Sequence, residues 1–576
     1  MFKWCKLISV MEIRFTLFIV LTSLFCGIVS AAQERYGAYI PWTTYEAEQM
    51  TTTGSVLGPK YGPYQVETES SGQRCVKLTA KGQYLEFAAI APANSLVIRY
   101  SLQDGPAGEG LSARLSIYKN GRFVDRCVAS SRYAWLYGKY PFSNDPAMGS
   151  PRHFYDEIRV KGLQIRKGDV IRIRWDDGPG EYCIIDLVDL EAIAPPLKRP
   201  LNSLSLMDFS GNAFNGDYTQ SLRDCIARAV LEGKAVWIPA GSFKLTGDIL
   251  LPANVTIQGA GMWYTELVGD DNLYADANRR VRLKGNGSNI HIADLAITGK
   301  LDHRNDKEPN DGIVGSFGRG STISRVWIEQ TKVGMWIENS DSLRITGCRI
   351  RNTMADGINF CVGMSRSIIE QCTARGTGDD CFAVWPAVYS RQLFSPGNNL
   401  VLHCTGQLPY LANGAALYGG ESNVIRDCAF TDITAGSGIL ISTTFPTSSR
   451  ERGIDNNFSG TTVVENCAVK TCGGFDHEWG WRAALEICTD KRSIAGVIIS
   501  NVHIDSSLSN GVSVIARNGQ TLSDAVLRHV SVAVYGVGAD GKYGLFIPAG
   551  ARGRMDVREC SLGQVENEGK EFRMER

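Results

Sequence analysis

Two columns of apolar residues recur along the C-terminal part of the chain, always in the same order. The first column places one residue at the same point of successive short segments such as ISRVWIE, ITGCRIR and IEQCTAR. Its members are Val326, Cys348, Cys372, Cys404, Cys428, Cys467, Val502, Val530 and Cys560. A second column follows, with segments such as VGMWIE, DGINF, DCFAVW and GAALYGG. Repeats that keep their strands and vary their loops are typical of solenoids, so we predict a β-solenoid of about eleven rungs.

The N-terminal part has a different pattern, in which short alternating segments are separated by Gly or Asn-Gly turns. Segments such as SLVIRYSL and DVIRIRWDD indicate strands, and no long helical period interrupts them. We therefore predict a β-sandwich, or jelly roll, at residues 33–194. A Pro-rich linker at 195–204 separates it from the solenoid domain at 205–576.

One amphipathic helix is predicted between the linker and the solenoid, over residues 218–232, because its apolar residues follow a helical period. It runs into the segment AVWIPAGSFKLTGDILLPANVTIQGAG. This order of helix and strands resembles the entry to right-handed parallel β-helices of the pectate-lyase-like superfamily, in which the helix caps the open end of the coil. The resemblance implies an all-β fold, with a right-handed parallel β-helix preceded by a β-sandwich.

Residues 1–32 have the pattern of a signal peptide. Basic residues precede an apolar run from Phe15 to Val29, and small residues follow at 30–32. We expect the mature protein to begin near Ala32 and to be secreted, either outside the cell or into the periplasm. The alternative is a retained membrane anchor, but the apolar run is short for a span and polar sequence follows it at once.

Charge and cysteine content narrow the interpretation. The 60 Lys and Arg balance the 60 Asp and Glu, so the total gives no support to a nucleic-acid partner or a polyanionic substrate.

The chain has 16 Cys, which in an exported protein would favour disulfides. The column cysteines, however, occupy the inward position of stacked strands, where Cys behaves as a small apolar residue. We predict that most of Cys348, Cys372, Cys404, Cys428 and Cys467 are free thiols.

Three aspartates lie in two segments that repeat one another, DGINF and DDCFAVW. Superposing the segments places Asp356 on Asp380, so on adjacent rungs these two side chains would lie roughly 4.8 Å apart. Asp379 sits one residue earlier, at the bend. Carboxylates this close repel one another, so at least one should hold a proton near neutral pH. One acid and one carboxylate are what glycoside hydrolysis requires. The alternatives are a calcium site or aspartates that cap turns.

The two ends of the N-terminal domain resemble the first and last strands of family 35 and family 6 carbohydrate-binding modules. The matching segments are YEAE, at residues 45–48, and IDLVDL, at residues 185–190. The resemblance implies a jelly roll with a structural Ca²⁺ held by Glu46, Glu48 and Asp186, whose hard oxygen ligands suit calcium. Three aromatic residues could stack on sugar rings or pack against the neighbouring domain; they are Trp135, Tyr137 and Tyr140.

The aspartate segments, DG-x-N followed by G-D-D-C-x-A-V-W, on a β-helix behind a β-sandwich resemble the α-1,3-glucanase (mycodextranase) family of glycoside hydrolases. Polygalacturonases share a similar pair of segments, but they continue with G-H-G one rung later and then R-I-K. Here the next rung is GAALYGG, at residues 414–420, without His, Arg or Lys. The resemblance therefore implies hydrolysis of a neutral α-1,3-glucan of the mutan or nigeran type, with no cofactor for catalysis.

By the same resemblance, Asp356, Asp379 and Asp380 are the catalytic group. Asp379 is expected to give a proton to the glycosidic oxygen, while Asp356 and Asp380 hold and deprotonate water, which leads to inversion. Gly378 is expected to allow the backbone turn that brings the Asp379 side chain into the cleft.

Other candidates are aromatic residues near the catalytic rungs, which either form sugar-stacking platforms or cover the side of the coil. These candidates are Trp385, Tyr418, Trp479 and Trp481. The polar insertion at residues 300–311, KLDHRNDKEPND, is either a cleft wall or a solvated loop, and we expect the loop.

The leading hypothesis is a secreted, monomeric, endo-acting hydrolase whose partner is the polysaccharide, with no nucleic acid and no membrane association after leader cleavage. A second hypothesis is that the same aspartates hydrolyse another polysaccharide, such as dextran or a pectic chain. A third is a non-catalytic carbohydrate-binding or adhesive β-helix whose aspartates bind Ca²⁺. A polysaccharide lyase is a further alternative, but the catalytic rungs offer no clear Arg or Lys base.

Overall fold

The computed structural model describes residues 36–140, 142–476, 480–539 and 541–576, which form a parallel β-helix preceded by a β-sandwich, as predicted. The signal peptide predicted at residues 1–32 lies outside the described residues. Among the helices of the described part, none combines the length and apolar character needed to cross a membrane. The described residues include five 3-10 helices, at Ala47–Gln49, Val66–Glu69, Ser71–Gln73, Pro146–Met148 and Leu206–Asn212.

The β-sandwich consists of two antiparallel sheets. The first contains β1 (Trp42–Glu46), β3 (Ser55–Leu57), β4 (Cys75–Leu78), β6 (Ala93–Leu102), β11 (Asp156–Ile165) and β13 (Cys183–Glu191). The second contains β2 (Thr51–Thr52), β5 (Tyr84–Ala88), β7 (Ser112–Lys119), β8 (Arg122–Ser130) and β12 (Val170–Asp177). Alternate residues of the strands, such as Ile98, Ile117 and Ile173, are buried between the sheets and form one core.

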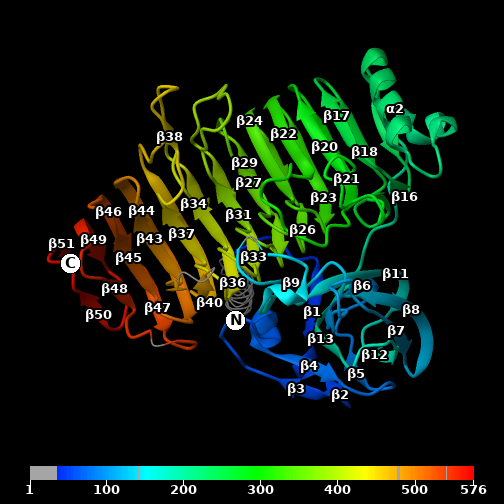
Figure 1. Cartoon of the computed structure of the whole chain (residues 1–576), viewed down its shortest axis with the longest axis horizontal. Coiled ribbons are helices and arrows are strands. Elements are labelled where there is room, and N and C mark those ends of the chain that lie inside the picture. Colours follow the sequence, from blue (N-terminus) through cyan, green and yellow to red (C-terminus); the bar gives the residue numbers. More distant parts are fainter. Residues whose placement is uncertain (1–35, 141, 477–479, 540) are drawn as a thin grey trace, which may run out of the picture. The chain divides into compact units, whose positions relative to one another are not determined.

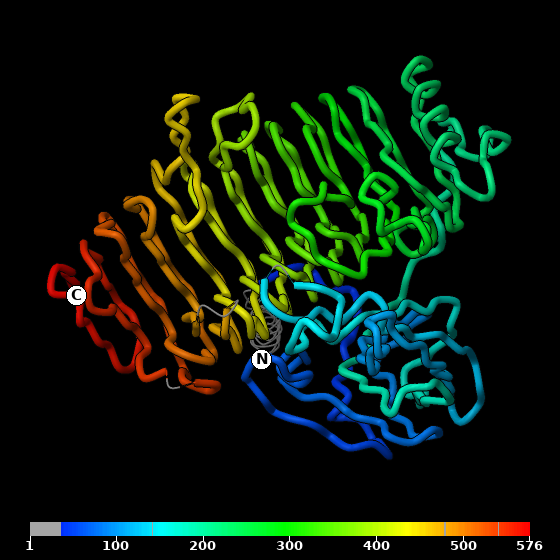
Figure 2. The backbone as a smooth tube through the Cα atoms, in the orientation of Figure 1, coloured from blue at the N-terminus to red at the C-terminus, as the bar shows by residue number. Residues whose placement is uncertain are grey.

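The β-helix is built from two long parallel sheets, whose strands lie side by side in Figure 1. The sheet that carries the site contains β17 (Asp248–Pro252), β20 (Arg282–Asn286), β22 (Gly312–Arg319), β24 (Met335–Asp341), β27 (Ile358–Phe360), β28 (Met364–Ser365), β31 (Phe382–Val384), β34 (Ala415–Leu417), β37 (Ile439–Ser442), β43 (Leu485–Thr489), β45 (Val512–Ala516), β48 (Leu545–Ile547) and β50 (Val565–Asn567). Figure 2 shows the backbone turning through successive rungs as its colour changes from green to red.

The other long sheet contains β14 (Ser203–Ser205), β15 (Ala235–Ile238), β16 (Gly241–Lys244), β18 (Thr256–Gly259), β19 (Thr265–Val268), β21 (His291–Thr298), β23 (Thr322–Glu329), β25 (Arg344–Thr346), β26 (Arg349–Arg351), β29 (Ile368–Glu370), β30 (Thr373–Arg375), β32 (Leu400–Leu402), β33 (Thr405–Gln407), β35 (Val424–Arg426), β36 (Ala429–Ile433), β40 (Thr462–Cys472), β44 (Ile494–Ser507), β46 (Leu522–Arg528), β47 (Ser531–Val534), β49 (Arg552–Arg558) and β51 (Glu571–Glu575). Short two-stranded pairs complete the fold: β9 (Leu136–Tyr137) with β10 (Pro151–Arg152), β38 (Ser448–Ser449) with β39 (Ile454–Asp455), and β41 (Phe475–Asp476) with β42 (Gly480–Trp481).

Residues in each rung alternate between the core and the outer face, as the period of a strand requires. Ile358 and Phe360 of β27 are fully buried in the core of the coil, whereas Asn359 between them belongs to the outer face. The register aligns Asn359 with Trp336 of the preceding rung and with Ala383 of the next. This outer column forms the floor on which the candidate site is built.

The helix α2 (Thr219–Glu232) covers the first rungs, as predicted. Its buried residues include Leu222, Ile226 and Ala229, which join the core of the coil. Burial of a side chain the size of Leu contributes roughly 2 kcal/mol. The helix ends at Gly233, whose φ of 62° is left-handed and favours glycine.

The column cysteines lie inside the coil as free thiols, which confirms the prediction. None of the 14 cysteines in the described residues forms a disulfide. Successive members of the column are neighbours across rungs, and the Cys348 amide donates to the Cys372 sulfur at 3.4 Å. Burial disfavours the thiolate, so these cysteines act as packing residues.

Buried ion pairs join the sandwich to the coil. Arg349 of β26 binds both carboxylate oxygens of Glu191 at 2.7 Å. Arg375 of β30 reaches Asp189 at 2.8 Å and Glu157 at 2.5 Å. Separating the partners of a buried ion pair would leave uncompensated charges, which is strongly unfavourable. These contacts therefore hold the sandwich in one position on the coil.

Candidate active site

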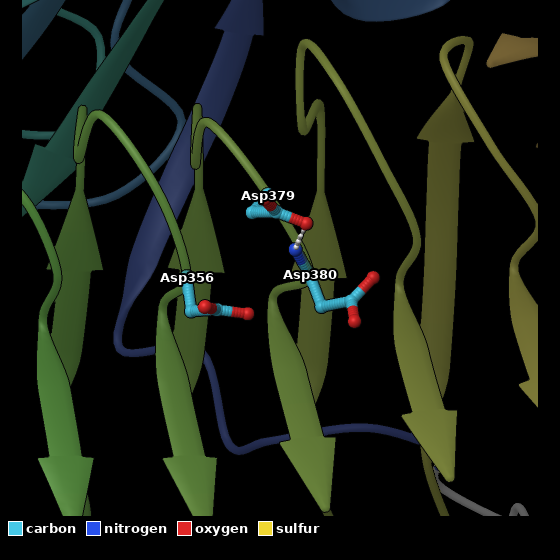
Figure 3. Close-up of side chains that lie close together, drawn as sticks. All are labelled: Asp356, Asp379 and Asp380. Carbon is cyan, nitrogen blue, oxygen red and sulfur yellow. Dashed lines mark hydrogen bonds between the residues drawn. The ribbon is translucent and has the colours of Figure 1, made fainter. Parts of the chain in front are cut away.

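The turns that precede β27 and β31 bring three aspartates together. The Gly357 amide donates to the Asp380 carbonyl at 2.9 Å, so Asp356 and Asp380 occupy equivalent positions on adjacent rungs. One carboxylate oxygen from each of Asp356, Asp379 and Asp380 lies within 4.8 Å of the others. Figure 3 shows the three side chains, with Asp379 held to the Asp380 amide by a hydrogen bond of 3.2 Å.

Gly378 has a different role from the one expected. Its φ is not in the left-handed region, and a side chain there would meet the backbone carbonyl of Met354 at 2.2 Å and the Tyr410 hydroxyl at 2.4 Å. Space, rather than backbone freedom, therefore requires glycine before Asp379. The absence of a side chain lets the two catalytic turns stack closely.

Burial and mutual repulsion shift the protonation of the aspartates. Burial, followed by the charges of Asp379 and Asp380, raises the pKa of Asp356 well above its ordinary value. Burial and the charge of Asp379 also raise the pKa of Asp380, to about 7. Since the carboxylates of Asp356 and Asp380 repel each other, this pair holds a proton near neutral pH. A stored proton beside an ionised carboxylate is what acid/base hydrolysis needs.

Asp380 is held by three hydrogen bonds from the next rung. The backbone amide and side-chain amide of Asn413 donate to Oδ1 at 3.1 and 2.7 Å. The Tyr418 hydroxyl donates to Oδ2 at 2.8 Å. Tyr418 was a candidate for sugar stacking, but its side chain is only 5% exposed. Its contact with Asp380 shows that it orients a carboxylate as well as lining the groove.

The insertion at residues 300–311 is not the solvated loop that the sequence predicted. Arg304, from its middle, is 5% exposed and reaches the Asp379 Oδ2 atom at 2.7 Å. The same guanidinium donates to the carbonyls of Met354 at 3.2 Å and Gly378 at 2.6 Å. These hydrogen bonds hold the insertion against the coil, where it forms a wall of the cleft. The repeat pattern of the sequence does not identify Arg304, because this residue lies outside both columns.

A groove of about 820 Å³ crosses the outer face of the coil above the aspartates. Its lining comes from five neighbouring strands on the N-terminal side, β17, β20, β22, β24 and β27, and continues to Tyr418 after β34. Neighbouring strands lie ~4.8 Å apart, so the groove is long enough for several sugar units. Asp356, Asp379 and Asp380 all line it.

Aromatic rings form the wall of the groove beyond the aspartates. Trp385, a predicted substrate-binding residue, lies 6.0 Å from Trp336 and 5.9 Å from Phe445 between ring centroids. Phe445 in turn lies 5.0 Å from Tyr418. The sequence analysis missed Trp336 and Phe445. Trp336 could have been found, because it occupies the outer column one rung before Asn359.

The remaining aromatic candidates divide into several environments. Trp481, on β42, is 37% exposed, packs on Phe475 and does not line the groove. Trp479 lies outside the described residues. In the sandwich, Trp135 and Tyr137 bond to the Leu102 carbonyl and to Asp104. Tyr140 alone reaches the groove, where its ring covers Arg304 and its hydroxyl donates to Asp306.

The residues predicted to hold calcium lie near one another but differ in their hydrogen-bond partners. Asp186 is fully buried and accepts hydrogen bonds from Arg99 and from the Ser71 amide. Burial and the charge of Asp186 raise the pKa of Glu46 to about 8. The Oε2 atoms of Glu46 and Glu48 are buried without a hydrogen-bond partner. Those two oxygens fit a cation, whereas Arg99 already neutralises Asp186.

Among the described residues, Asp356, Asp379 and Asp380 supply the one set of three ligand atoms close enough for a metal ion. Arg304 already supplies a positive charge in direct contact with Asp379. The same contact makes a cation at the site unfavourable. The arrangement therefore favours acid/base chemistry over calcium binding.

Comparison with known proteins identifies the family of the chain. The family models for α-1,3-glucanase catalytic domains D1 and D2 match residues 39–193 and 218–554. No curated protein sequence matches the chain.

Several solved structures resemble the whole chain. The catalytic unit of the thermostable GH87 α-1,3-glucanase from Streptomyces thermodiastaticus strain HF3-3 is 27% identical, with a TM-score of 0.77, over 94% of this chain and 96% of that one. A GH87 α-1,3-glucanase catalytic domain in complex with nigerose is 25% identical, with a TM-score of 0.77, over 94% and 99%. The Agl-KA catalytic domain, 23% identical with a TM-score of 0.83 over 95% and 99%, shares the fold. The chain, whose coil and sandwich both match, belongs to the α-1,3-glucanase catalytic-domain family.

Proposed function

We propose that this protein is a glycoside hydrolase that cleaves α-1,3-glucan internally, through Asp356, Asp379 and Asp380. The observation that carries the proposal is the set of three carboxylates, within 4.8 Å of one another, in a groove that crosses several rungs. Relatives described as bound to nigerose or tetrasaccharides support the substrate class. A groove that extends over several sugar units suits a polymer bound along its length.

The proposed reaction is inverting hydrolysis. Asp379 gives its proton to the glycosidic oxygen, and Asp356 and Asp380 bind and deprotonate the water that attacks the anomeric carbon. The nearest oxygens lie within 4.8 Å, closer than the ~6.5–9.5 Å typical of inverting pairs. Inversion at this separation requires the water to bind at the edge of the group, and we propose that Asp356 and Asp380 hold it there together.

Two measurements test the proposal. Reducing-sugar release from insoluble α-1,3-glucan, dextran and polygalacturonate should occur on the first and persist after chelation. Asp379→Asn should lower this rate about 10²- to 10⁴-fold. Asp294→Asn is the matched control, because Asp294 is buried on the coil and pairs with Arg325 away from the groove. Inactivity of the wild-type protein on α-1,3-glucan would defeat the proposal.

Proton NMR of the first product settles the stereochemistry, because an inverting enzyme releases the β-anomer from an α-glucan. A first product in the α-configuration would exclude inversion. The same time course separates internal from terminal cleavage, since an endo-acting enzyme releases long oligosaccharides before short ones.

Three further proposals start from the sequence. The chain is secreted after cleavage near Ala32, it acts as a monomer, and its sandwich holds one Ca²⁺. The sequence indicates Glu46, Glu48 and Asp186 as the calcium ligands, and we now propose the first two. Their buried, unpartnered Oε2 atoms support the calcium site. N-terminal sequencing of the exported protein and light scattering of the purified protein test the first two.

A further inference from the structure

The insertion that carries Arg304 is anchored from several sides. Arg304 bonds to two backbone carbonyls of the catalytic turns and forms an ion pair with Asp306 at 3.0 Å. Tyr140 of the sandwich covers the guanidinium, with 5.2 Å between its ring centroid and Cζ, and donates to Asp306. The guanidinium is therefore fixed before any substrate arrives.

Its charge acts on the catalytic group. The Nη2 atom lies 2.7 Å from Asp379 Oδ2, and the charge of Arg304 opposes the rise in the pKa of Asp356 that burial causes. In a buried site, such an ion pair interacts more strongly than it would at the surface. The other ionisable groups around Arg304 are Tyr140, Asp306, Lys332 and Tyr410.

We propose that Arg304 is a positioning residue for the acid step, because it stabilises the carboxylate that Asp379 becomes when its proton leaves. This inference rests on the proposed function. As the bond from the anomeric carbon to the glycosidic oxygen breaks, that oxygen takes the proton of Asp379. The water oxygen bonds to the anomeric carbon, and the water proton passes to Asp356 or Asp380. Negative charge develops on Asp379 during this step, and the guanidinium of Arg304 is already in position to stabilise it.

The cycle closes when the proton returns to Asp379 from Asp356 or Asp380. The three carboxylates lie within 4.8 Å, so that transfer is short. In this structure Arg304 contacts Asp379. Arg304 therefore affects the acid without touching the sugar bond itself.

Two substrates separate this role from a merely structural one. An α-1,3-linked tetrasaccharide has a leaving group that needs a proton, whereas nitrophenyl α-nigeroside has one that does not. Arg304→Met should lower kcat on the tetrasaccharide about 10²-fold or more, with little change in KM. On the nitrophenyl substrate the loss should be less than about tenfold, because no proton is required. Arg304→Lys keeps the charge and should recover part of the rate.

Arg280→Met is the matched control. Arg280 is also fully buried and pairs with Glu308 of the same insertion, but it has no contact with the aspartates. It should lower the melting temperature and leave the ratio of rates on the two substrates unchanged. Equal losses on both substrates for Arg304→Met and Arg304→Lys would overturn the inference. A wild-type protein that cleaves neither substrate would instead overturn the proposed function.

Discussion

Removing one hydroxyl should move the pH dependence of this enzyme. In Tyr418→Phe the aromatic ring remains, but Asp380 loses the hydrogen bond that Tyr418 donates at 2.8 Å. Burial raises the pKa of Asp380 to about 7, and the bonds from Asn413 and Tyr418 oppose that rise. A hydrogen bond to a charged group is worth about 1.5–3 kcal/mol. At 1.36 kcal/mol per pKa unit, its loss should raise the pKa of Asp380 by ~1–2 units.

The direction follows from the proposed role of Asp380. A base must be ionised, so activity falls as the pH drops through its pKa. A higher pKa should move the acidic limb of kcat/KM upward by ~1–2 pH units, while activity on the plateau is largely kept. The acidic limb of the pH profile reports an apparent pKa of the coupled carboxylates, not of Asp380 alone. The assay measures kcat/KM on a soluble α-1,3-linked oligosaccharide across the acidic, neutral and mildly alkaline range.

Tyr410→Phe is the control for this experiment. Tyr410 is also a buried tyrosine, but its hydroxyl donates to the Thr353 carbonyl at 3.0 Å and forms no hydrogen bond with Asp380. Its profile should keep the acidic limb of the wild type. An unchanged limb in Tyr418→Phe, or a limb moved to lower pH, would refute the reasoning about Asp380.

Three other predictions concern stability and redox state. Glu191→Gln breaks the buried pair with Arg349 and should lower the unfolding free energy by about 3–5 kcal/mol in urea titrations; a change within error would show that the pair is dispensable. Bound calcium at saturation should stabilise the fold by on the order of 2–3 kcal/mol, so chelation should lower the melting temperature. The melting temperature of a Glu46→Gln, Glu48→Gln double variant should not change on chelation. Titration of the unfolded, unreduced mature protein should find the 14 cysteines as thiols, which complete pairing would contradict.

The strands of the coil and the sandwich could be predicted from the sequence, whereas the loops that wall the groove could not. The alignment of Asp356 with Asp380 follows from strand register, which is a property of every rung. Arg304 and Phe445 lie in connections of unique length, and only tertiary contacts bring them to the groove. Their positions depend on carbonyls and rings far away in the chain, which no local pattern encodes.

The calcium site stays a prediction, and the sequence does not show what surrounds its three carboxylates. Carboxylates at both ends of the sandwich were expected to converge, but the sequence does not show that Arg99 lies against Asp186. The same limit applies to Tyr418, whose ring was expected to face sugar. Its hydroxyl has a carboxylate partner on the preceding rung, 38 residues earlier in the chain.

The thiol column has a practical meaning for anyone who makes this protein. A coil whose described cysteines pack side by side in the reduced form needs no oxidant and no disulfide isomerase to reach its native state. Production in the reducing cytoplasm of a bacterial host should therefore yield correctly folded material, provided that residues 1–32 are left out of the gene.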